Sequence, residues 1–289
     1  MKKSVLPLLA LIFIFLYPEK ASADGLVNVV IPERELVVSN TPLDLYLPGD
    51  IIESAISVGT FVSSFAYKKF FVKSDWDGQK LDLDTVPAFD RWSAHPYNHS
   101  LDLAGDVTSL FNLVLVPLSF FGSELLIGNI AFSDVMVLTK LYGDAFLFSY
   151  GVKNWLNVAV NRYRPYMYFD DPYYDEIKDG EYKWSFPSGH VKAAFMTATF
   201  MHYTLCQYFP DSVWKWPVIA VSYAAATLTG VLRVLSGNHF FTDVLSGAAI
   251  GAASTLAILV LHDSNITKNT KGVLHGSVSP LSLSYSFSL

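Results

Sequence analysis

Long apolar stretches constrain the fold of this chain more than any other feature. They cover residues 107–123, 125–138, 193–209, 218–232 and 244–261. Most lie near the lower length limit for a helix that crosses a bilayer. Only 16% of the residues are charged, whereas soluble domains carry about 25%. We therefore predict an all-α helical bundle, with several helices passing through a membrane.

Small residues in these stretches allow close helix packing. Gly247 and Gly251 are one helical turn apart, and residues 224–226 are alanines. Such spacing lets two helices approach closely in lipid. It suits a tight soluble bundle equally well, so a soluble periplasmic bundle stays open as the alternative.

Charge and cysteine content exclude several classes of function. The formal net charge is −6, which argues against nucleic acid as a partner. Cys206 is the single cysteine. It excludes an intramolecular disulfide and a metal site built from several thiolates.

The two ends of the chain carry their own patterns. Residues 1–23 read as a signal peptide, with Lys2 and Lys3 before an apolar run and cleavage expected after Ala23; an uncleaved anchor is the alternative. We expect a peripheral segment over 24–103 with one helix near 51–67, a catalytic bundle over 104–262 and a tail over 263–289. Apolar residues alternate with serine over 281–289, which predicts a short C-terminal strand.

The first polar island lies after a long apolar stretch. It contains Lys153, Asn157 and Arg164. At 3.6 residues per turn, a continuous helix would place all three on one face. The alternative interpretation is a helix end whose cations complement the helix dipole.

The second island, Pro187-Ser188-Gly189-His190, directly precedes an apolar helix. Ser188 is a natural helix cap, and Gly189 allows a ligand to approach the backbone closely. The helix start would then offer N–H groups to an anion beside His190. A capped helix with an incidental histidine is the alternative.

The third island joins two apolar helices and contains Arg233, His239 and Asp243. His239 and Asp243 are four residues apart, so the carboxylate could accept a hydrogen bond from one ring nitrogen and leave the other as a nucleophile. The alternative is that Asp243 only complements a helix dipole. Guanidinium groups, backbone N–H groups and two histidines together suit phosphate chemistry.

Taken together, Arg164-Pro165, the second island and Arg233-x5-His239-x3-Asp243 resemble the signature of the type 2 phosphatidic acid phosphatase superfamily. The resemblance covers roughly residues 151–251. It implies a helical bundle and a metal-independent phosphatase, without a cofactor, that forms a phosphohistidine intermediate. The roles that it implies are His239 as nucleophile, Asp243 as its orienting partner, His190 as general acid, and Arg164, Ser188, Gly189 and Arg233 as the phosphate-binding residues.

The sequence departs from the family pattern at two positions. Asn157 stands where the family has a lysine, and we assign that role to Lys153, one turn earlier. Leu232 replaces a serine that commonly precedes Arg233.

The expected substrate is a phosphorylated membrane lipid: phosphatidic acid, an isoprenoid diphosphate or lipid A. A vanadium-dependent haloperoxidase and a non-catalytic protein that binds anionic headgroups are the alternatives.

A count of spans predicts the orientation. If the signal peptide is cleaved, two spans before the site, 107–123 and a long helix ending near Val160, put the site on the periplasmic or exterior side. The helix near 51–67 would then not span. Lys140 and Asp144 lie within the second span and count against it, since charges are costly in lipid unless they face the interior of a bundle.

Overall fold

The computed structural model describes residues 42–43, 45, 47–71, 76, 80–170, 177 and 180–263. The regular structure of these residues is helical, apart from one antiparallel bridge between Leu43 and Asp263. This confirms the predicted all-α fold class. The predicted signal peptide and C-terminal strand lie outside the described residues.

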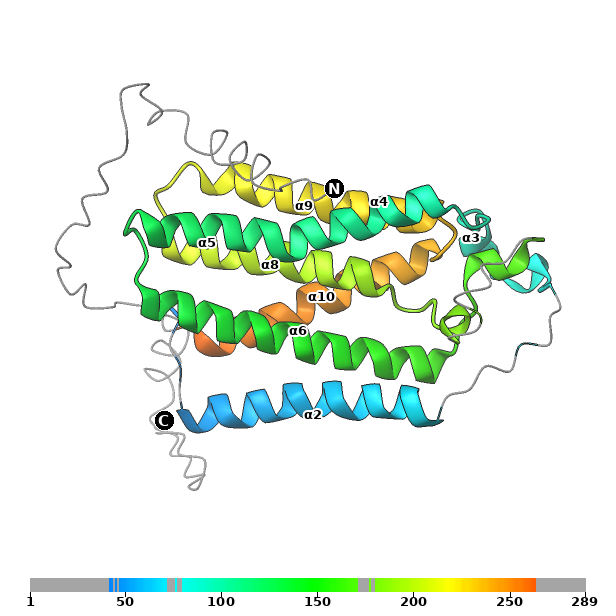
Figure 1. Cartoon of the computed structure of the whole chain (residues 1–289), viewed down its shortest axis with the longest axis horizontal. Coiled ribbons are helices and arrows are strands. Elements are labelled where there is room, and N and C mark those ends of the chain that lie inside the picture. The colour runs from blue at the N-terminus through cyan, green and yellow to red at the C-terminus, as the bar shows by residue number, and fades with distance from the viewer. Residues whose placement is uncertain are drawn as a thin grey trace, which may run out of the picture.

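The main helices run side by side (Figure 1). They are α2 (Leu47–Phe71), α4 (His99–Leu110), the π-helical turn η2 (Phe111–Leu115), α5 (Val116–Leu126), α6 (Phe132–Val160), α8 (Gly189–Tyr208), α9 (Lys215–Leu235) and α10 (Phe241–His262). Shorter elements are α3 (Ala88–Arg91), η1 (Leu83–Thr85), η3 (Pro165–Tyr168) and η4 (Glu181–Lys183). Helix α8 packs against α4, α6, α9 and α10, so it forms the centre of the bundle.

Helices α8 and α10 approach each other closely at Gly247 and Gly251, whose spacing allows such an approach. A Cβ atom at Gly247 would lie 2.5 Å from the carbonyl oxygen of Ser188, and one at Gly251 would overlap the carbonyl oxygen of Lys192. Only glycine permits this contact. It brings the first turns of the two helices, and with them the second and third polar islands, together.

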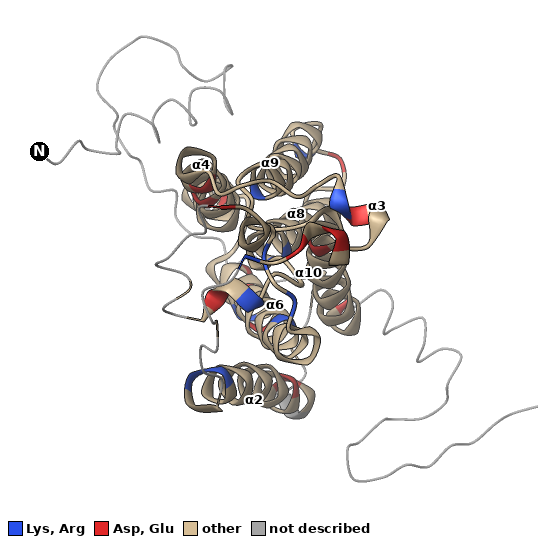
Figure 2. Ribbon diagram, turned by 90° about the vertical axis from the view of Figure 1, so that its right-hand side faces the viewer, with Lys and Arg blue, Asp and Glu red and all other residues tan. Residues whose placement is uncertain are grey.

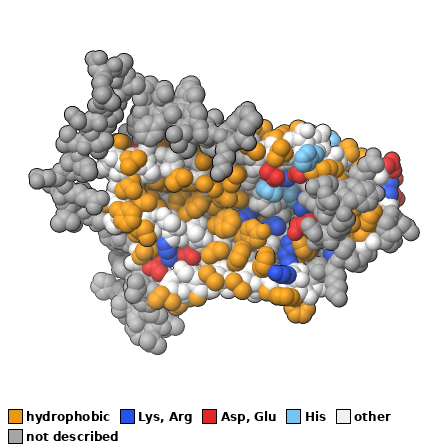
Figure 3. All heavy atoms as spheres, viewed as in Figure 1, with side chains coloured by type: hydrophobic (Ala, Val, Ile, Leu, Met, Phe, Trp, Pro, Cys, Tyr) orange, Lys and Arg blue, Asp and Glu red, His pale blue; other side chains and the backbone are white. Residues whose placement is uncertain are grey.

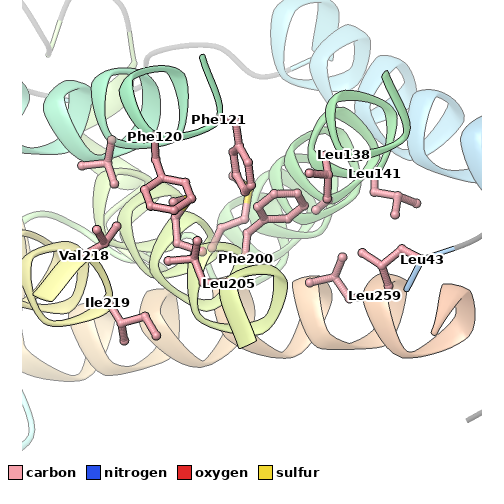
Figure 4. Close-up of a cluster of buried hydrophobic side chains, with 14 of the residues drawn as sticks. Leu43, Phe120, Phe121, Leu138, Leu141, Phe200, Leu205, Val218, Ile219 and Leu259 are labelled. Carbon is pink, nitrogen blue, oxygen red and sulfur yellow. The ribbon is translucent and has the colours of Figure 1, made fainter. Parts of the chain in front are cut away.

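The apolar core occupies one end of the bundle (Figure 4). It joins the end of α5, the start of α6, the end of α8, the start of α9 and the end of α10 through buried side chains that include Phe120, Leu141, Leu205, Ile219 and Leu259. Figure 2 looks onto the opposite end, where ribbon segments of charged residues lie near α6, α8 and α10. The core thus leaves that end to polar residues.

Within the described residues, three helices are long and apolar enough to cross a membrane: the continuous helix His99–Leu126 formed by α4, η2 and α5, and helices α9 and α10. Their outer faces carry exposed apolar side chains, including Leu118, Val221 and Leu245, and Figure 3 shows an extensive apolar surface. These features support a membrane location. The apolar stretch 125–138 is divided by a turn with Gly128 at a φ of 79°, which separates α5 from α6.

The helix expected near 51–67 is α2, which is longer than predicted and lies alongside α6 rather than across the end of the bundle (Figure 1). Lys140 on α6 donates to Asp50 on α2 at 2.9 Å and lies 3.1 Å from Asp144. Both charged residues of α6 therefore face a neighbouring helix. The ion pairs reduce the cost of burying these charges.

Candidate active site

A cavity of about 270 Å³ lies between α4–η2, α6 and α8. Figure 3 shows histidine and cationic side chains gathered in this part of the surface. Five of the predicted site residues line the cavity: Lys153, Arg164, Gly189, His190 and His239. Ser188, Arg233 and Asp243 do not line it. The fold thus brings residues of all three polar islands to one cavity.

His239 lies in the turn between α9 and α10, with its side chain buried. Its Nδ1 atom is 2.7 Å from the carbonyl oxygen of Ser185. Because a carbonyl can only accept, Nδ1 must carry the proton of the neutral ring, which leaves a lone pair on Nε2. Burial lowers the pKa of His239 well below its usual value, and Arg164 and Arg233 lower it further. The geometry and the charges therefore favour a neutral imidazole.

The expected hydrogen bond from His239 to Asp243 is not formed. Oδ2 of Asp243 lies 4.0 Å from Nδ1 of His239, beyond hydrogen-bonding distance. This oxygen instead accepts from the Ser185 hydroxyl at 2.5 Å and from the Phe240 N–H at 2.8 Å. Spacing along a helix placed the two side chains close together, but the main chain of Ser185 takes the ring nitrogen.

Arg162, which the sequence analysis did not single out, holds Asp243 from the other side. It donates to Oδ1 of Asp243 at 2.7 Å and to Asp90 on α3 at 2.6 Å. Asp90 also accepts from the N–H of Thr242 at 3.1 Å, so it caps the start of α10. The signal in the sequence was the cationic run Arg162-Tyr163-Arg164; nothing local identified Asp90.

Arg164 reaches the cavity from a loop, and its predicted place on one helical face with Lys153 is wrong. Helix α6 ends at Val160, where Asn161 adopts the left-handed conformation with φ of 49°, and Pro165 disfavours helix at the residue before it. The Arg164 guanidinium donates to the side chain of Asn238 at 2.7 Å and to the main-chain carbonyl of Glu181 at 3.0 Å. These contacts fix its position.

Arg233 is held away from the cavity by two carboxylates of α4. Its terminal nitrogens form ion pairs with Asp102 and Asp106. Asp106 also lies 3.2 Å from Nε2 of His190, and so links the two polar islands. The sequence signal for this pair was two carboxylates one turn apart near the start of an apolar stretch.

Asn157 and Lys153 have different roles at the position where the family has a lysine. The Asn157 amide donates to the carbonyl oxygen of Phe186 at 2.7 Å and so holds the loop before the second island. Nζ of Lys153 lies 3.5 Å from the position that a Cβ of Gly189 would occupy. Lys153 therefore reaches the start of α8 from one turn further back, and its phosphate-binding role stays a prediction.

The start of α8 also contains buried groups without a partner. Ser188 precedes the helix, but its hydroxyl makes no capping bond and has no hydrogen-bond partner. Lys192, one turn later, is likewise buried without a partner for its ammonium group. The sequence analysis missed this lysine, although a cation within an apolar stretch was a visible signal. In the described part of the chain, no group of three or more metal-ligating side chains could hold a metal ion.

Comparisons with known proteins agree with these motifs. Residues 139–266 match the PAP2 superfamily. A lipid A 1-phosphatase of Porphyromonas gingivalis is 32% identical over 114 residues, which cover 36% of this chain and 24% of that protein. Phosphatidylglycerophosphatase B of Bacillus subtilis is 29% identical over 119 residues, which cover 41% and 53% of the two chains. This chain thus matches about a quarter and about half of the length of these relatives.

A solved structure was also found, the crystal structure of a transmembrane PAP2-type phosphatidylglycerolphosphate phosphatase from Bacillus subtilis. It is 18% identical, and the alignment covers 71% of this chain and 94% of that one with a TM-score of 0.31.

Proposed function

We propose that this chain, whose residues 139–266 belong to the PAP2 superfamily, is a phosphatase that hydrolyses a phosphorylated membrane lipid through a phosphohistidine on His239. The observation that carries the proposal is the bond from Nδ1 of His239 to the Ser185 carbonyl at 2.7 Å. It leaves the lone pair of Nε2 for attack on phosphorus. The lining of the cavity by His239, His190 and Arg164 supports the same reaction.

In the first step, Nε2 of His239 forms a bond to phosphorus while the bond from phosphorus to the lipid oxygen breaks. His190 delivers a proton to the departing oxygen, and Asp106 at 3.2 Å positions the ring. In the second step, His190 accepts a proton from a water molecule as its oxygen attacks phosphorus, the N–P bond breaks to return neutral His239, and phosphate leaves. Arg164, Lys153 and the start of α8 at Gly189 provide positive charge for the phosphate oxygens.

The walls of the cavity support a lipid substrate. Leu113 on η2 and Phe146 on α6 line it together with the charged groups, and apolar side chains surround its opening (Figure 3). A phosphate group attached to an acyl or isoprenoid chain fits such a mixed surface. The names of the relatives support lipid A and phosphatidylglycerophosphate as candidate substrates, beside phosphatidic acid and isoprenoid diphosphates. We place the site on the periplasmic or exterior side of the membrane.

Phosphate release in detergent tests this function. The purified full chain is incubated with each candidate lipid in the presence of a chelator. Samples labelled from a ³²P-lipid are quenched in alkaline detergent and examined for an acid-labile, base-stable phosphoenzyme. We expect release from at least one lipid and a phosphoenzyme that disappears in His239→Ala. Release without any phosphoenzyme would contradict the covalent mechanism, and folded protein that releases phosphate from none of the lipids would contradict the function.

A further inference from the structure

Lys192 is a buried cation that the reaction described above does not use. Its side chain is fully buried on α8, and its ammonium group has no hydrogen-bond partner. It lies 4.7 Å from the ring centre of Phe146 and 4.9 Å from that of Tyr150. Aromatic faces attract a cation, but they replace only part of its hydration. A buried ammonium group in this setting calls for an anion.

The cavity beside Lys192 has an excess of positive charge. Lys153 approaches the same Tyr150 ring, at 5.4 Å, and Arg164 lines the same space. Glu181 is the carboxylate among the lining residues, and it lies 3.6 Å from Arg164. Among the described residues, neither lysine forms an ion pair with a carboxylate. Three cations therefore face one carboxylate, and the site is set up for more than one anionic group.

Lys192 also lies deeper in the bundle than the phosphate-binding residues. It is four residues into α8 from Ser188, or roughly 6 Å along the axis. The rings it contacts, on Tyr150 and Phe146, precede Lys153 by about one and two turns on α6, which runs toward the site. Its ammonium group thus lies on the side of the cavity away from the turn that holds His239. On the proposed function, the chain of a lipid whose terminal phosphate meets His239 would extend past Lys192 on that deeper side.

We propose that Lys192, together with Lys153, binds a second anionic group of the substrate, between the hydrolysed phosphate and the lipid chain. This inference rests on the proposed function and narrows its substrate class to lipids with two neighbouring anionic groups. Two chemistries meet that description: an isoprenoid diphosphate, and a diacyl lipid with a phosphodiester that carries a terminal phosphomonoester. Phosphatidic acid has only the terminal group.

The test compares three substrates with the wild-type chain and with Lys192→Met, which keeps the length of the side chain and removes its charge. The substrates are farnesyl diphosphate, phosphatidylglycerophosphate and phosphatidic acid, the last two with the same acyl chains. Charged hydrogen bonds of this kind contribute about 10- to 100-fold. In Lys192→Met, we expect kcat/KM for at least one two-anion lipid to fall by about 10- to 100-fold. This fall should exceed the fall for phosphatidic acid by about tenfold or more. The lipid that falls most identifies the source of the second anion.

Lys69→Met is the matched control, because Lys69 is exposed at the end of α2 and its loss removes the same charge. It should affect all three substrates equally. An equal fall of all three in Lys192→Met, or no fall in any, would overturn the inference. Lys192→Gln is made in parallel, so that a packing defect of methionine cannot be mistaken for the loss of charge.

A binding measurement separates the inference from the proposed function. Thermal unfolding of the full chain in detergent is followed with methylenediphosphonate or methylphosphonate, neither of which can be hydrolysed at its P–C bond by phosphoryl transfer. We expect the diphosphonate to raise Tm more than the monophosphonate in the wild type, and this difference to disappear in Lys192→Met. If the difference is seen without turnover of any lipid, the second-anion site stands and the phosphatase function fails. If lipids are turned over but the two phosphonates raise Tm equally, the phosphatase function stands and the second-anion site fails.

Discussion

Oδ2 of Asp243 lies 4.0 Å from Nδ1 of His239, and Ser185 connects the two side chains. The Ser185 hydroxyl donates to Asp243 at 2.5 Å, and its carbonyl oxygen lies 2.7 Å from Nδ1 of His239. The carboxylate therefore acts on the loop that holds the ring rather than on the ring itself. Asp243 is a positioning residue in this arrangement.

This relationship predicts that Asp243→Asn and Ser185→Ala act through the same path. Each single change should slow phosphoenzyme formation, because each frees the loop that orients His239. The double variant should be little slower than Asp243→Asn alone, since contacts in one network are not additive. Stopped-flow or quench-flow measurement of phosphoenzyme formation at saturating substrate checks this. If the double variant slows phosphoenzyme formation by the product of the two single effects, Asp243 acts on His239 by a route that does not include Ser185.

The two histidines should respond differently to the leaving group. His239→Ala removes the nucleophile and should abolish turnover of both an alkyl phosphate and p-nitrophenyl phosphate. His190→Ala removes the proton donor, which contributes about 10²–10⁴-fold to the rate. The loss should be smallest with p-nitrophenyl phosphate, because p-nitrophenol leaves as a stable anion without a proton. Steady-state rates with both substrates provide the comparison. Equal rescue of the two variants by the nitrophenyl group would contradict the assigned roles.

The ion pairs of Arg162 should be important for stability. Arg162 bridges Asp90 and Asp243, both fully buried. Arg162→Met leaves two buried carboxylates without their partner, at a cost of about 3–5 kcal/mol. Lys80→Met is the control, because the Lys80–Asp170 pair is largely exposed and contributes about 0–1 kcal/mol. Denaturant unfolding in detergent measures both, and similar losses for the two variants would refute the prediction.

The proposed orientation can be tested by labelling cysteines. In a Cys206→Ser background, Phe89→Cys places a thiol at the end of the bundle that contains the site, and Val213→Cys places one at the other end; both positions are exposed. We expect a membrane-impermeant maleimide to label position 89 in intact cells and position 213 only after lysis. The reverse pattern would place the site inside and would indicate that α2, which lies along the bundle (Figure 1), also crosses the membrane.

Local sequence patterns predicted the parts of the site that depend on one segment. The helical fold followed from the apolar stretches, and the spacing of Gly247 and Gly251 allowed a close helix contact without naming the partner. The motifs around Arg164, His190 and His239 predicted a phosphate site, and these three side chains line one cavity. Within each motif, residue chemistry and short spacing were enough to identify the groups, although the three motifs come from separate segments.

The partners of these residues depend on segments far apart in the chain, and only the tertiary structure decides them. The Ser185 carbonyl at His239, Asp90 at Arg162, and Asp106 at Arg233 and His190 come from other elements than the residues they contact. Main-chain carbonyls and carboxylates are both possible acceptors for each donor. The acceptor that forms the hydrogen bond is the one that helix packing brings within hydrogen-bonding distance. The sequence alone determined which chemical groups this site contains; the packing of the helices determined which of them meet, and left Lys192 buried without a partner.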